Sequence, residues 1–105
     1  MEKITINKHN TEKAYAAFQT GKIAVATDGK HHGIIKYDDL ARTGTNREYK
    51  WSICAFGNML ISLFNGRFKE IYIINPLDKN IFNTYEEMMQ AVREKATHVI
   101  VKEEI

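Results

Sequence analysis

The chain has 105 residues, of which 44% are hydrophobic and 10% aromatic, with a single cysteine and a single proline. This length fits one domain spanning residues 1–105, and the hydrophobic share excludes a disordered chain. A lone cysteine excludes an intrachain disulfide. The formal charge of +2 is too small to predict nucleic-acid binding from net charge alone.

The sequence predicts a cytoplasmic protein. No stretch approaches the run of about 18 apolar residues that predicts a membrane span. Charged residues interrupt the first ten positions, so no signal peptide is predicted. Cys54 lies in an apolar run and is interpreted as a buried, inert thiol, which suits a reducing compartment.

The N-terminal segment predicts a strand followed by a helix. Polar and apolar residues alternate over 3–7, a pattern typical of a half-buried strand. Asn10 or Thr11 can cap a helix that runs to about Thr20, and Gly21 is the stop signal. The helix is short and amphipathic, so it needs a sheet to pack against.

A hairpin and a loop are predicted next. Residues 22–27 and 33–37 read as two strands around the turn signal Asp28-Gly29. The following segment, 38–48, is polar and shows no clear period. We interpret it as a surface loop.

The centre of the chain fits two interpretations. The pairs Gly57-Asn58 and Asn65-Gly66 are typical of tight hairpin turns. The segments that these pairs separate are 50–56, 59–64 and 67–75. The favoured interpretation is a three-stranded antiparallel meander. The alternative is one buried helix over 49–64, which places Gly57 inside the helix at a cost of about 1 kcal/mol relative to alanine.

The C-terminal segment predicts a second helix and a last strand. Thr84 and Glu87 have the spacing of a capping box. Apolar residues then recur at helical spacing through residue 96, which predicts a helix over 84–96. Residues 98–101 read as the closing strand.

These elements predict an α+β fold in the order β-α-β-β-loop-β-β-β-α-β. The sheet is expected to be mainly antiparallel, with the meander at its centre. Two amphipathic helices are available to cover one face of that sheet.

A metal-dependent enzyme is one functional alternative. Glu48 and Lys50 would share one face of a strand, with Asp38 or Asp39 upstream, as in some metal-dependent nucleases. The pattern is short, and it arises readily in a chain with 27% charged residues. His31-His32 would point to opposite faces of a strand and therefore cannot chelate one ion. We predict no catalytic residues, no metal and no cofactor.

A nucleic-acid-binding domain with a basic face is a second alternative. Tyr37, Tyr49 and Phe68 are surrounded by basic residues, a combination that can bind single strands. Among those basic residues are Lys22, Arg67 and Lys69. The simpler interpretation places the aromatic rings in the core and the basic side chains in solvent.

The favoured prediction is a small non-catalytic module that occupies the surface of a protein or of a protein–nucleic acid complex. Apolar residues are concentrated over 59–64 and 71–74, more than two short helices are expected to cover. A partner protein or a second copy could cover the surplus. An edge strand could also pair across a two-fold axis to form a homodimer.

This compact, motif-poor chain is similar in type to accessory proteins of phages and mobile elements, such as anti-restriction and anti-CRISPR inhibitors. That resemblance implies an inhibitor that binds a host protein. The predicted binding surface is the hairpin and the loop that follows it. Its candidate residues are Lys30, His31, His32, Lys36, Arg42, Arg47 and Lys50.

Overall fold

The computed structural model describes residues 1–29, 32–36, 59–75 and 82–104. The labelled elements are β1 (Glu2–Ile6), α1 (Glu12–Gly21), β2 (Ile23–Thr27), β3 (His32–Lys36), β4 (Glu70–Ile74), α4 (Tyr85–Lys95) and β5 (Ala96–Lys102). Residues 59–64 are also helical. No helix within the described ranges is both long and apolar enough to cross a membrane.

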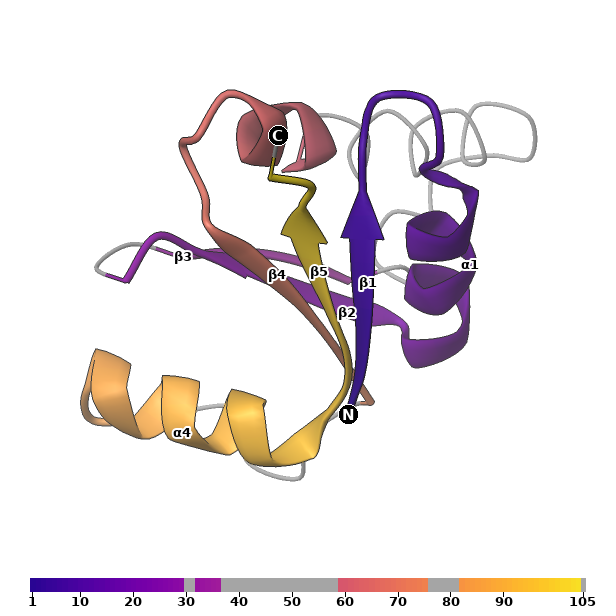
Figure 1. Ribbon diagram of the computed structural model, residues 1–105. Helices are drawn as coiled ribbons and strands as arrows, with labels where there is room; N and C mark the ends of the chain where they lie inside the picture. Colours follow the sequence, from indigo (N-terminus) through magenta and orange to yellow (C-terminus); the bar gives the residue numbers. More distant parts are fainter. Residues whose placement is uncertain (30–31, 37–58, 76–81, 105) are drawn as a thin grey trace, which may run out of the picture.

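The strands form one five-stranded sheet in the order β1-β5-β4-β2-β3 (Figure 1). The pairs β5–β4, β4–β2 and β2–β3 are antiparallel, whereas β1 and β5 are parallel. The predicted α+β class and the mainly antiparallel sheet are therefore confirmed. The predicted β2–β3 hairpin is confirmed as well, with Thr27 opposite His32.

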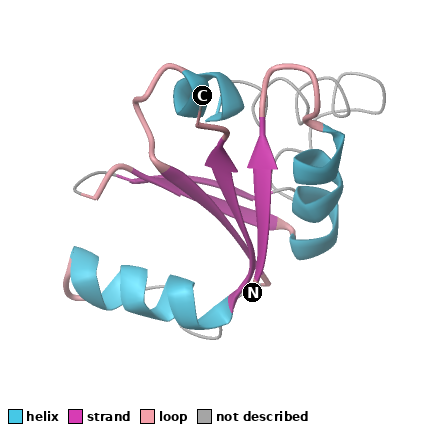
Figure 2. Cartoon of the chain, in the orientation of Figure 1, coloured by secondary structure: helices cyan, strands magenta, loops and turns pink. Residues whose placement is uncertain are grey.

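Helices cover both faces of the sheet, not one face as predicted (Figure 2). Ala24 and Ala26 of β2 pack in a core cluster with α1 and with the helix at 59–64. Val25, which points to the opposite face, packs in a second cluster with Met89 and Val92 of α4. Successive strand residues point to opposite faces, so β2 contributes to both clusters.

The predicted central meander is wrong, because residues 59–64 are helical. Gly66 lies just past this helix with φ of +77°. Its N–H donates to the Leu63 carbonyl (3.1 Å), and the Arg67 N–H donates to the Ser62 carbonyl (2.9 Å). These two bonds form a Schellman motif, in which glycine ends a helix. The helix alternative is confirmed for 59–64, and residues 49–58 lie outside the described ranges.

This helix buries most of the apolar residues that were expected to form an uncovered surface. Met59, Leu60 and Leu63 are buried together with β4 residues on the α1 side of the sheet. Phe64 is half-buried against the same cluster. Among the described residues of this region, Ile61 alone is a strongly exposed large hydrophobic side chain. The apolar concentration therefore belongs to the core and does not mark a docking patch.

Helix α1 lies very close to β4 at its C-terminal end. A Cβ built on Gly21 would overlap Cγ2 of Ile73 and would lie 3.3 Å from the carbonyl oxygen of Ile74. Gly21 therefore permits close packing, and the left-handed residue that ends the helix is Lys22 (φ 78°). At the other end, Thr11 is the N-cap but makes no side-chain capping bond.

Polar contacts hold α4 on the opposite face. The Thr84 hydroxyl accepts from the Glu87 N–H at 3.1 Å, which confirms the predicted N-terminal cap. The Tyr85 hydroxyl is hydrogen-bonded to the Thr27 hydroxyl on β2. Helix α4 ends at Lys95 and β5 begins at Ala96, so no loop separates the two elements.

Candidate protein-binding site

The structure describes only part of the binding set predicted from sequence. Lys30, His31, Arg42, Arg47 and Lys50 lie outside the described residues. His32 and Lys36 are the first and last residues of β3, four positions or about 13 Å apart along the strand. In the sheet order, β3 and β1 lie at opposite edges.

The residues proposed for the metal-dependent enzyme, Asp38, Asp39, Glu48 and Lys50, also lie outside the described ranges, as does Cys54. Within those ranges, no group of three or more His, Cys, Asp or Glu side chains is placed to hold a metal ion.

One aromatic residue of the nucleic-acid alternative is described, and it contacts the core. Phe68 is half-buried and packs against the cluster on the α1 side. Its basic neighbours Arg67 and Lys69 are exposed. This placement favours a packing role for the Phe68 ring over base stacking. Tyr37 and Tyr49 lie outside the described ranges.

The strand at the other edge, β1, has a backbone orientation that can be assigned. The Glu103 N–H donates to the Ile6 carbonyl at 2.8 Å, so the amide groups of Ile6 point toward β5. Residues two apart in a strand direct their amide groups to the same side, so those of Ile4 also point toward β5. The N–H and C=O groups of Lys3 and Thr5 therefore point away from the sheet. No described strand pairs with them.

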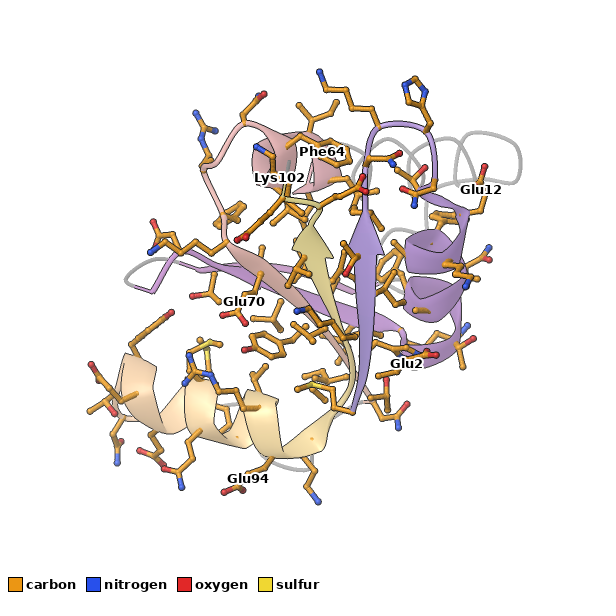
Figure 3. The ribbon with its side chains drawn as sticks, in the orientation of Figure 1. Glu2, Glu12, Phe64, Glu70, Glu94 and Lys102 are labelled. Carbon is orange, nitrogen blue, oxygen red and sulfur yellow. The ribbon has the colours of Figure 1, made fainter. Side chains whose placement is uncertain are left out.

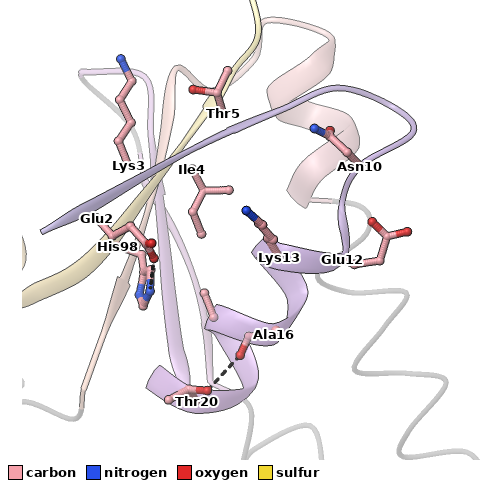
Figure 4. Close-up of a pocket in the computed structure, with 11 residues that line it drawn as sticks. Glu2, Lys3, Ile4, Thr5, Asn10, Glu12, Lys13, Ala16, Thr20 and His98 are labelled. Carbon is pink, nitrogen blue, oxygen red and sulfur yellow. Dashed lines mark hydrogen bonds and ion pairs between the residues drawn. The ribbon is translucent and has the colours of Figure 1, made fainter.

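Side chains anchor β1 to the core on one face only. Ile4 and Ile6 are buried and belong to the cluster that includes α1. Lys3 and Thr5 are exposed, and Figure 4 shows them on the side of the strand opposite Ile4. β1 is thus fixed by side-chain packing and by its pairing with β5. Its outer edge pairs with no strand that the structure describes.

A groove of about 700 Å³ runs between β1 and α1 (Figure 4). Residues 2–5 form its strand side. On the helix side the lining includes the small residues Ala16, Ala17 and Thr20. The Thr20 hydroxyl donates to the Ala16 carbonyl at 3.0 Å, so its proton is already engaged by the helix backbone. Because these side chains are small, they leave room beside the strand.

The charges that line the groove are balanced. Glu2 and Lys3 come from β1, and Glu12 and Lys13 come from α1 (Figures 3 and 4). At the end of the groove, Glu2 Oε2 lies 3.0 Å from Nε2 of His98 on β5. The Glu2 side chain remains 70% exposed. This mixture of charges does not select for a strongly acidic or strongly basic ligand.

The arrangement is suited to strand addition. An extended segment lying beside β1 would receive hydrogen bonds from the outward amide groups of Lys3 and Thr5, and its side chains would lie against the groove. Proteins usually protect such an edge with proline, a bulge or charged side chains. β1 contains no proline, and it pairs with β5 without a register shift. Of these protecting features, the centre of β1 has one, the charge of Lys3.

Sequence reasoning identified β1 as a strand but not as the candidate site. Edge position depends on the pairing of β1 with β5, whose registered partners, such as Ile4 and Ile100, are far apart in the sequence. The local signal was the lack of proline and of consecutive charges over residues 3–6. That signal alone does not distinguish an edge strand from a central one.

Comparisons of the chain with protein-family models, with curated proteins and with solved structures found no match. Function is therefore inferred from the chain's own geometry.

Proposed function

We propose that this protein is a binding module that recognises another polypeptide by adding its strand to the outer edge of β1. The observation that carries the proposal is the outward direction of the Lys3 and Thr5 amide groups, which follows from the bond between Glu103 N–H and the Ile6 carbonyl (2.8 Å). Backbone bonds of this kind supply affinity, and pockets beside the strand supply specificity.

The groove along α1 supports the same proposal. It runs beside the outward edge, and its lining combines backbone, small helix residues and balanced charges. A binding role of this type needs no metal, no cofactor and no reacting side chain. It also fits a module that occupies a protein surface, including an inhibitor of the phage or mobile-element type.

Random peptides displayed on phage provide a direct test. We expect the protein to select extended sequences rich in β-branched residues, which favour strands. Bound peptide should slow hydrogen exchange at the Lys3 and Thr5 amides, measured by NMR. The Ile4 and Ile6 amides should change little, because they already face β5.

The variant Thr5→Pro tests the edge itself. Proline removes the outward N–H, and proline is tolerated on an edge strand where that N–H faces solvent. We expect Thr5→Pro to abolish peptide binding while the protein stays folded. The matched change Ile4→Pro removes an amide that faces β5 and should lower the unfolding temperature. Peptides whose binding protects other amides, or survives in a folded Thr5→Pro variant, would contradict the proposal.

A further inference from the structure

We infer that the strand received by this edge is β1 of a second copy, antiparallel and related by a two-fold axis at Ile4. This inference rests on the proposed function and names its partner. A two-fold interface uses the same patch on both copies, so the patch must be complementary to itself. The residues of β1 and the outward amide groups of Lys3 and Thr5 meet that requirement.

The length of β1 fits this axis. The strand runs from Glu2 to Ile6, so its middle residue is Ile4. A two-fold axis there places Lys3 opposite Thr5 of the second copy, and Thr5 opposite its Lys3. These are the two residues whose amide groups point outward, so each pair can exchange both backbone bonds. No outward amide of either strand is then left without a partner.

Neighbouring registers fit less well. An axis at Lys3 would place the two Lys3 side chains directly opposite each other, which is destabilising. An axis at Thr5 would require the Asn7 N–H to bond across the interface. That N–H already donates to the Asn10 side-chain oxygen at 2.5 Å, at the start of the turn that follows β1.

The α1 face of this pairing is favourable as well. Each Ile4 would lie opposite the other Ile4, and Glu2 would lie opposite Ile6 of the second copy. Ile4 is 8% exposed and lines the groove, so the exposed part of its side chain would face the incoming strand. The small residues Ala16 and Thr20 allow the second copy to approach beside α1. No like charges would lie directly opposite each other.

Two substitutions at one position test this register with opposite signs. Thr5→Lys places lysine opposite Lys3 of the second copy, twice in each dimer. Thr5→Glu places glutamate there. We expect the dimer dissociation constant, measured by analytical ultracentrifugation at low salt, to rise about tenfold in Thr5→Lys and to fall about tenfold in Thr5→Glu. Thr5 is exposed, so both variants should unfold at similar temperatures when diluted until the protein is monomeric.

A charge exchange completes the test. The double variant Lys3→Glu/Thr5→Lys restores opposite charges across the axis and should dimerise at least as tightly as wild type. Equal effects of Thr5→Lys and Thr5→Glu, or a wild-type chain that stays monomeric at millimolar concentration, would overturn the inference. If such a monomer still bound peptide at β1, the proposed function would stand with a different occupant. Lys3 and Thr5 amides that exchange freely both in the dimer and with added peptide would instead overturn the proposed function.

Discussion

Helices α1 and α4 lie on opposite faces of the sheet. Both pack on an apolar cluster, and α4 adds hydrogen bonds to the sheet. Helix α1 has no side-chain N-cap and depends on close contact, which is tightest where Gly21 meets Ile73. Helix α4 is capped by Thr84, and its Tyr85 hydroxyl is hydrogen-bonded to Thr27 of β2. Apolar contact is sensitive to volume, whereas polar contact is sensitive to hydrogen bonding and charge.

The polar attachment of α4 centres on Tyr72 of β4. Its hydroxyl donates to Glu70 Oε2 at 2.9 Å, and Figure 3 shows Glu70 between the sheet and α4. The Arg93 guanidinium on α4 interacts with the same hydroxyl. Burial raises the pKa of the Tyr72 phenol, Arg93 opposes that rise, and Glu70 adds to it. The two faces should therefore respond differently to mutation and to pH.

The largest effect is expected on the α1 face. If the new Cβ met no other atom, Gly21→Ala would stabilise the helix by as much as about 1 kcal/mol. Because the new Cβ would overlap Cγ2 of Ile73, we expect a net loss of about 1–3 kcal/mol in the free energy of unfolding, measured with urea.

A double-mutant cycle with Ile73→Ala identifies the cause of that loss. Removing Cγ2 should make Gly21→Ala less costly, with a coupling energy of about 0.5–3 kcal/mol. An additive result would show that the Ile73 side chain is not what excludes alanine. Gly66→Ala is a useful contrast, because it meets no atom within 4 Å and tests positive φ alone.

The next effect distinguishes the starts of the two helices. Thr84→Ala removes the bond accepted from the Glu87 N–H, so we expect a loss of about 1 kcal/mol. Thr11→Ala removes no capping bond and should change the stability by less than about 0.5 kcal/mol. Equal losses in the two variants would remove this difference between the helices. Urea unfolding of both proteins at the same pH provides the measurement.

The smallest effect should appear only at high pH. A raised pKa means that the folded protein holds the Tyr72 proton more tightly than the unfolded chain does. The resulting stability is complete below about pH 10 and is lost as pH rises through the higher folded pKa. We expect wild type to lose stability more steeply than Tyr72→Phe above pH 10, in urea unfolding at a series of pH values. Parallel curves would show that Tyr72 does not contribute.

Local patterns in the sequence determined much of the secondary structure. The sequence predicts a helix over 84–96 with a Thr84 cap, and the structure has α4 at Tyr85–Lys95. It also predicts the β2–β3 hairpin and the first and last strands. Helix periodicity, capping and turn chemistry act within a few residues, so they can be read along the chain. The Asn65-Gly66 pair misled because a glycine at positive φ suits both a hairpin turn and a helix end.

Only the tertiary structure decided which surface is available for binding. The pairing of β1 with β5 joins the two ends of the described chain, and it leaves the Lys3 and Thr5 amides on the outer edge. The tertiary structure also places α1 and α4 on opposite faces of the sheet. Such contacts depend on residues far apart in the sequence, and their energy comes from burial that no local pattern records. The sequence by itself therefore determined the elements, while long-range packing determined the edge and the groove.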